Sequence, residues 1–157
     1  MARTKSFTYR TSIEWKEGIA AELASEGKPT ITISTPPEFK GLEGRWTPEN
    51  LYVASIESCL LYTFIALARS RELDYAAYSS TAEGLLETVE GQMVVSTVTV
   101  RPRIVIKNET DREKAEGIVG RLEPNCFISN SVESEVIIEA EIVIAEAAKS
   151  KAAKTGD

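Results

Sequence analysis

The stretch TPENLYVASIESCLLYTFIALARSR, residues 47–71, predicts one long helix that decides how the rest of the chain folds. Thr47 is a good helix cap, Pro48 suits the first helical position, and Glu49 complements the positive end of the helix dipole. The residues that follow are apolar at nearly every helical angle, which indicates burial on most faces. We therefore expect a core helix that begins at Pro48 and ends near Arg71.

The segments on either side of this helix are rich in β-branched and aromatic residues and predict strands. Before the helix we expect strands over 6–15, 19–26 and 28–35, then a proline-rich loop at 36–41. After it we expect strands over 75–89 and 92–107, joined by a tight turn at Glu90-Gly91, and a last strand over 135–145.

Several residues give finer expectations for the second half of the chain. In the strand over 92–107, one face should carry Val94, Val98, Val100, Ile104 and Ile106, and Pro102 suggests a sheet edge or a bulge. Thr110 to Glu113 has the form of a capping box, opening a helix that turns Ala115, Ile118, Val119 and Leu122 inward and stops at Pro124. Cys126 then lies on a turn or a short second helix. Since strands and helices are segregated along the chain, we expect an α+β fold.

Length and charge narrow the class of protein. A chain of 157 residues predicts a single domain, here residues 1–145, followed by a frayed tail over 146–157. The 18 basic and 24 acidic residues give a net charge of −6 without a basic patch, so nucleic acid is not an expected partner.

The chain contains no histidine, which excludes Ser-His-Asp and Cys-His catalysis and most zinc or non-haem iron sites. Its only two cysteines, Cys59 and Cys126, are 67 positions apart, a spacing that fits no zinc or iron–sulfur motif. We therefore expect no organic cofactor and no metal, although a hard-cation site built from carboxylates stays open without a supporting motif such as an EF-hand loop.

Residues 1–9 lack an apolar signal region, so we expect a cytoplasmic protein whose cysteines are reduced thiols. Residues 51–68 are apolar over the length of a membrane span, but Glu57 lies among them. An acidic residue in mid-membrane costs roughly 2.5–3.5 kcal/mol on insertion scales, which favours a buried helix over a membrane span.

The two cysteines have two interpretations. Buried cysteine is often an ordinary small apolar residue of a core. Alternatively, the pair carries thiol redox chemistry, in which a thiolate attacks a peroxide and a second thiol traps the sulfenic acid before it is overoxidised. Because only about 3% of an ordinary thiol is ionised at pH 7, an attacking cysteine needs a cation or hydrogen-bond donors beside it.

Five stretches, in this order, favour the redox interpretation. They are PPEF at 36–39, WTPENL at 46–51, IESC at 56–59, AEG at 82–84 and NCFISNS at 125–131. With these motifs, the chain resembles the OsmC/Ohr family of osmotically inducible and organic hydroperoxide resistance proteins over about residues 7–144. The resemblance implies an α+β fold in which long central helices pack against antiparallel sheets in an intertwined homodimer.

The resemblance also implies a function and a site. Cys59 would be the peroxidatic cysteine and Cys126 the resolving one, with Glu49 as the glutamate at the start of the helix. The substrate would be an apolar organic hydroperoxide, and an external dithiol would reduce the Cys59–Cys126 disulfide. Tyr62, Phe64 and Phe127 are candidates for lining an apolar substrate pocket, although such residues are more often core.

The chain departs from the family pattern at two places. The family's activating arginine, in a Gly-Arg-x-Gly turn, corresponds to Lys16 in Trp15-Lys16-Glu17-Gly18, with Arg45 as a second candidate cation. Lysine lacks the planar fork with which arginine holds a carboxylate and a thiolate together. The usual His-x-x-Cys-Pro around the resolving cysteine is also absent, since Glu123 and Phe127 take those places.

Helix geometry bears on the assembly of the site. Glu49 and Cys59 are ten residues apart, which is roughly 15 Å along a continuous helix. If both belong to one site, the glutamate comes from a partner chain or the helix is broken.

Two other functions stay open on the same fold: a non-enzymatic module that binds a small ligand, and a redox sensor that forms the disulfide with little turnover.

Overall fold

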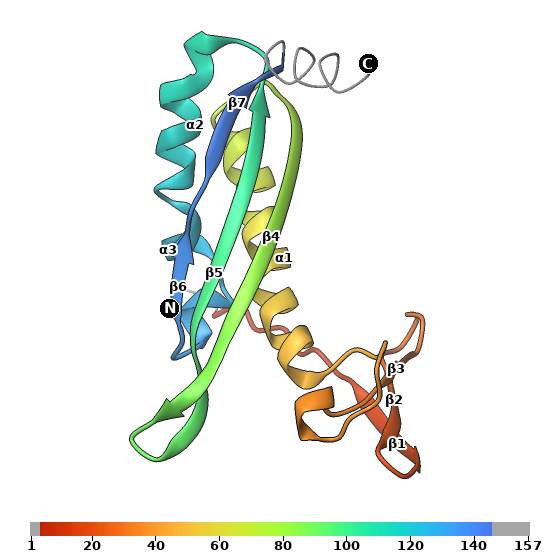
Figure 1. Cartoon of the computed structure of the whole chain (residues 1–157). Helices are drawn as coiled ribbons and strands as arrows, with labels where there is room; N and C mark the ends of the chain where they lie inside the picture. Colours follow the sequence, from red (N-terminus) through yellow and green to blue (C-terminus); the bar gives the residue numbers. More distant parts are fainter. Residues whose placement is uncertain (1–3, 146–157) are drawn as a thin grey trace, which may run out of the picture. The chain divides into compact units, whose positions relative to one another are not determined.

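The computed structural model describes residues 4–145, so the expected tail at 146–157 lies outside the described residues (Figure 1). Within the described range the chain divides into two compact units, residues 4–51 and residues 52–145. The expected extent of a single domain over 1–145 stays a prediction. Elements of both types are present and segregated along the chain, which confirms the α+β fold.

The first unit is built on an antiparallel meander of three strands: β1 (Ser12–Glu17), β2 (Ala20–Ala24) and β3 (Ile31–Ile33), followed by the 3-10 turn η1 (Pro37–Phe39). The strands are shorter than the sequence predicted. The pairing of β1 with β2 ends at Ser12 opposite Ala24, so residues 6–11 have no partner strand and are not part of the sheet.

The first unit buries little of its own apolar surface. Every residue of β1 is exposed, and Ile33 is its only apolar residue in the described range with as little as 9% exposure. Trp15 is 71% exposed and Tyr9 is 90% exposed. Large aromatic side chains exposed at this density are typical of a surface that binds another molecule.

Helix α1 (Pro48–Ser70) begins where the sequence predicted and ends one residue before Arg71. Its cap is also as expected, because the Asn50 N–H donates to Thr47 Oγ1 at 3.2 Å. Burial on most faces was wrong for the single chain: only one stripe, Ile56, Leu60, Phe64 and Ala68, is fully buried. By length and composition alone α1 would also suit a membrane span. Its buried stripe, however, belongs to the core of the second unit.

The second unit contains a long hairpin, β4 (Tyr75–Val89) and β5 (Gln92–Ile106), as the sequence predicted. The turn residues Glu90 and Gly91 have φ of 49° and 82°, the left-handed values that a two-residue hairpin turn requires. Two short strands, β6 (Glu135–Ile138) and β7 (Glu141–Ile144), pair parallel to β5 on its other side. The predicted single last strand over 135–145 is therefore wrong, because it is divided in two. The sheet is mixed, antiparallel between β4 and β5 and parallel between β5 and the two short strands.

Pro102 explains this interruption. It was expected at an edge or a bulge, but β5 is the central strand of the sheet. β6 pairs with β5 up to Val100 and β7 resumes at Arg103. Because proline has no N–H to donate, the break in the neighbouring strand falls where a hydrogen bond cannot be made.

The predicted face of β5 is correct except at Val94. A register shift between Leu85 and Leu86 places Val95, instead of Val94, against the core. Val94 is 37% exposed. A bulge of this kind reverses which side chains point inward, and alternation in the sequence does not reveal it.

The connection between β5 and β6 holds the 3-10 turn η2 (Glu109–Asp111), α2 (Arg112–Val119), α3 (Leu122–Asn125) and the 3-10 turn η3 (Ser129–Ser131). The predicted capping box is wrong, because α2 begins at Arg112 without a side-chain cap. The predicted inward residues are confirmed: Ala115, Ile118 and Leu122 are fully buried, and Val119 packs partly against them.

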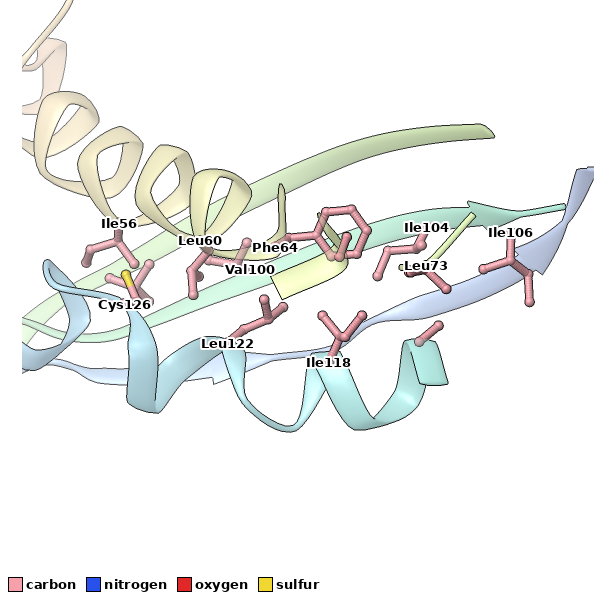
Figure 2. Close-up of a cluster of buried hydrophobic side chains, with 13 residues drawn as sticks. Ile56, Leu60, Phe64, Leu73, Val100, Ile104, Ile106, Ile118, Leu122 and Cys126 are labelled. Carbon is pink, nitrogen blue, oxygen red and sulfur yellow. The ribbon is translucent and has the colours of Figure 1, made fainter. Parts of the chain in front are cut away.

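One hydrophobic cluster holds the second unit together (Figure 2). It combines the buried stripe of α1, the inward face of β5 and the apolar residues of α2 and α3. Phe64 lies within it, with its ring 5.0 Å from that of Tyr75 and 4.9 Å from that of Tyr78. Cys126 is part of the same cluster and lies at the end where Ile56 of α1 is found (Figure 2).

Gly84, on β4 opposite Val98, allows α1 to approach the sheet closely. A Cβ at this position would lie 2.7 Å from Val53 Cγ2. We expect Gly84→Ala to destabilise the protein by about 1–3 kcal/mol through overpacking, and Val53→Ala to recover part of the loss. Urea unfolding of the single and double variants measures this coupling.

Gly120 provides the matched control for that experiment. Its φ of −62° suits any residue, and an added Cβ would come no closer than 3.7 Å to another heavy atom. Gly120→Ala should leave the unfolding midpoint unchanged or raise it slightly. Equal losses at Gly84 and Gly120 would contradict the close-approach explanation.

Candidate active site

The second unit brings the two cysteines together from elements far apart in the sequence. Cys59 lies in the middle of α1 and is partly exposed, whereas Cys126 follows α3 directly and is fully buried. Both are free thiols. Their thiols are close enough that the presence of Cys59 raises the pKa of Cys126. A cysteine that solvent can reach therefore lies beside one that it cannot.

Burial is the main influence on Cys126 and raises the pKa of its thiol above the ordinary value. The neighbouring thiol of Cys59 acts in the same direction, while the hydroxyl and the N–H of Ser129 lower the pKa. Since burial disfavours a thiolate, Cys126 is the less suitable of the two to attack a substrate arriving from solvent. Cys59 is the thiol of the pair that a molecule in solvent can reach.

Glu49 lies in the first turn of α1, and α1 is unbroken from there to Cys59. Its Oε2 atom is buried and has no hydrogen-bond partner among the described residues. A buried carboxylate oxygen without a donor is unfavourable, so this position calls for a donor that the described chain does not supply.

The candidate cations do not supply that donor. Lys16 Nζ lies 3.0 Å from Glu14 Oε2 and 3.0 Å from Glu22 Oε2, and these two carboxylates are the first cause of its raised pKa. Arg45 is exposed and makes no ion pair within residues 4–145. The structure thus does not pair Glu49 with either predicted cation.

The aromatic candidates fall into two groups. Phe64 is fully buried and belongs to the core, so it does not line a substrate pocket. Tyr62 and Phe127 are 68% and 83% exposed. They provide apolar surface on α1 and after Cys126, available to an apolar ligand or to a second chain.

A hollow of about 820 Å³ lies elsewhere in the second unit, between the turn end of the β4–β5 hairpin and the segment that precedes β6. Its lining includes Tyr52, Val94 and Glu133 and neither cysteine. Tyr52 and Ser134 form a hydrogen bond of 2.8 Å at its side. The hollow is therefore separate from the thiol pair.

Two contacts near the cysteines were missed by sequence reasoning. Glu57, two residues before Cys59, accepts a hydrogen bond of 2.6 Å from Ser80 of β4. Ser129 places its N–H 3.4 Å from Cys126 Sγ. The sequence did contain a signal for Ser129, which lies three residues after Cys126 in an irregular segment. At this spacing a turn commonly brings a backbone N–H close to the side chain of the earlier residue.

Among residues 4–145 no three histidine, cysteine or acidic side chains gather in a way that could hold a metal ion.

The OsmC-like protein family model matches residues 41–141, which is more than half of the chain and includes both cysteines and Glu49. The chain belongs to the OsmC-like family.

Similar proteins agree with this assignment. An OsmC-like protein of unknown function from Vibrio cholerae superposes with a TM-score of 0.80 at 25% identity, covering 87% of this chain and 100% of that one. An organic hydroperoxide resistance protein from Elizabethkingia anophelis has a TM-score of 0.72 at 16% identity, covering 90% and 99%. The protein YmaD of Bacillus subtilis (strain 168) is 21% identical over 118 residues, 73% of this chain and 79% of YmaD. The OsmC-like fold predicted from the motifs is confirmed.

Proposed function

We propose that this OsmC-like protein is a thiol-dependent peroxidase that reduces organic hydroperoxides. The observation that carries the proposal is the pairing of a partly exposed Cys59 with a fully buried Cys126 in one site. The fold shared with an organic hydroperoxide resistance protein supports the same chemistry.

The proposed cycle needs only these two residues and an external dithiol. The Cys59 thiolate attacks the outer oxygen of the hydroperoxide, the O–O bond breaks, and the alkoxide takes a proton and leaves as an alcohol. Cys59 is then a sulfenic acid, which Cys126 converts into a disulfide with release of water. A dithiol supplies two electrons and two protons to restore both thiols.

We propose that the active assembly is a homodimer, with the substrate entering beside an interface between copies. Two observations support this. The first unit leaves Trp15 and Tyr9 exposed, and Glu49 Oε2 is buried without a donor among the described residues. In this proposal Glu49 and a cation such as Lys16 or Arg45 meet across the interface and stabilise the thiolate of Cys59. The protein would act in the cytoplasm, where dithiol reductants are available.

The proposal is tested by treating the purified protein with one equivalent of cumene hydroperoxide and measuring intact mass and free thiols. The parent should lose both thiols, while Cys126→Ser should retain a sulfenic acid on Cys59 that a 1,3-diketone probe traps. Survival of both thiols under excess peroxide would reject the peroxidase.

The two other candidate functions give different results in the same assay. A redox sensor would form the disulfide once and consume little further peroxide when a dithiol is supplied. A ligand-binding module would leave both thiols intact. Continuous consumption of cumene hydroperoxide with dithiothreitol as the reductant is expected only of the enzyme.

A further inference from the structure

Ser129 is a buried polar side chain that the proposed cycle does not yet use. It is 7% exposed, and its Oγ atom is buried without a hydrogen-bond partner in the described chain. The two other buried polar side chains in that range, Ser34 and Thr47, are both hydrogen-bonded. An unpartnered buried hydroxyl disfavours folding, so the Ser129 hydroxyl does not stabilise the reduced protein through a hydrogen bond of its own.

The turn that contains Ser129 makes hydrogen bonds to both the side chain and the backbone of Cys126. The Ser129 N–H donates to Cys126 Sγ at 3.4 Å, and the Asn130 N–H donates to the Cys126 carbonyl oxygen at 3.0 Å. The Ser129 hydroxyl lies beside the same sulfur without being aligned as a donor in the reduced protein. Since a serine O–H rotates freely about the Cβ–Oγ bond, it can turn toward this sulfur when the sulfur carries a negative charge.

We propose that Ser129 is a catalytic residue of the second half of the cycle, in which its N–H and hydroxyl together stabilise the thiolate of Cys126. The inference rests on the proposed function, because only a disulfide-forming cycle requires charge on Cys126. No charged donor is needed for this, because hydrogen bonds from two neutral donors to a thiolate are much stronger in a buried site than in water.

Two steps place the charge on this sulfur. In closure, the Cys126 thiolate attacks the sulfur of the Cys59 sulfenic acid; the S–S bond forms, the S–O bond breaks, and hydroxide takes a proton and leaves as water. In reduction, the external thiolate attacks Cys59, because Cys126 is fully buried. Cys126 then leaves with the electron pair of the S–S bond, and the second thiol of the reductant displaces Cys59.

The neighbours of Cys126 make its ionisation a clean readout. The titratable group that acts on its thiol is Cys59 from α1, and the segment that follows contributes the uncharged Ser129. Burial raises the pKa of Cys126 most, and both donors of Ser129 lower it. In a Cys59→Ser background Cys126 is the remaining thiol, and its thiolate can be titrated by ultraviolet absorbance. The same titration of the variant that lacks both cysteines is subtracted, because the five tyrosines also ionise and absorb at alkaline pH.

In that background, Ser129→Ala should raise the pKa of Cys126 by about one unit, the effect of losing one hydrogen bond to a charged acceptor. Ser131→Ala is the matched control, because the exposed Ser131 hydroxyl donates to the Phe127 carbonyl oxygen at 2.7 Å. It should leave the pKa unchanged. A purely structural role for Ser129 would instead lower the unfolding midpoint, which we expect to be unchanged or raised by removal of an unpartnered hydroxyl.

The kinetic test uses the chain with both cysteines and cumene hydroperoxide in a quench-flow experiment read by mass. Ser129→Ala should leave formation of the Cys59 sulfenic acid unchanged and slow disulfide closure about tenfold. If sulfenic acid forms but closure and the pKa are unchanged, the inference about Ser129 is overturned and the peroxidase stands. If neither a sulfenic acid nor a disulfide forms in the parent, the proposed function fails, and with it the catalytic role of Ser129.

Discussion

Cys59→Ser is expected to abolish catalytic reduction of organic hydroperoxides, lowering turnover by about three orders of magnitude or more, as loss of a covalent nucleophile does. The residue lies in the middle of α1, partly exposed and next to the buried Cys126. A hydroxyl in place of the thiol is not ionised at neutral pH and does not attack the O–O bond. Cumene hydroperoxide consumption with dithiothreitol in excess measures the effect.

Cys126→Ser is the matched comparison, since it removes the other thiol and keeps the first step. It should retain a rapid first turnover and then depend on direct attack by the external dithiol on the sulfenic acid. Both variants should unfold at similar urea concentrations. Equal residual turnover in the two variants would mean that the roles of Cys59 and Cys126 are not those assigned here.

The parts of the fold predicted best are those with strong local signals. The start of α1 rested on a capping threonine and a proline, and the β4–β5 hairpin on long β-branched runs around Glu90-Gly91; both were placed within a residue or two. The strands of the first unit were predicted too long, because a strand ends where its neighbour ends. The sequence of residues 6–11 does not show where the neighbouring strand β2 ends, so it does not show that these residues lack a partner.

The remaining errors have a common physical cause, which is pairing between distant segments. The split of the last strand into β6 and β7 depends on Pro102, 33 residues before Glu135. The exposure of Val94 depends on a bulge opposite Leu85 and Leu86. Neither alternation nor propensity carries this information, because each is a property of one segment.

The candidate site likewise contains residues that the sequence indicated and a residue that only the folded structure indicated. The residue types of a chain with two cysteines and no histidine left thiol redox chemistry or an ordinary core role for the cysteines. The resemblance implied the peroxidatic role of Cys59 and the resolving role of Cys126, and both roles stay predictions. Sequence reasoning assigned no role to Ser129 within its motif, because the role proposed for it rests on its burial and on its unpartnered hydroxyl among the described residues. Those two properties exist only once the chain is folded.

Phe64→Ala should have the largest effect on stability, because Phe64 holds α1 against the sheet. Its side chain is fully buried and its ring contacts those of Tyr75 and Tyr78. Truncation removes most of an aromatic ring and leaves a cavity, which costs about 3–5 kcal/mol in protein cores. The free energy of unfolding from urea titration, at one fixed protein concentration, measures the loss.

Phe64→Leu is the matched control, since it retains an apolar side chain of nearly the same volume and should lose much less, about 1–1.5 kcal/mol. Substitutions at Phe64 also test whether this residue affects only the stability of the fold or the reaction with peroxide as well. Phe64 is five residues from Cys59 but belongs to the core, so molecules that remain folded at low temperature should form the Cys59 sulfenic acid at the parental rate. A selective loss of peroxide reduction in a fully folded Phe64→Leu protein would instead return Phe64 to the substrate pocket.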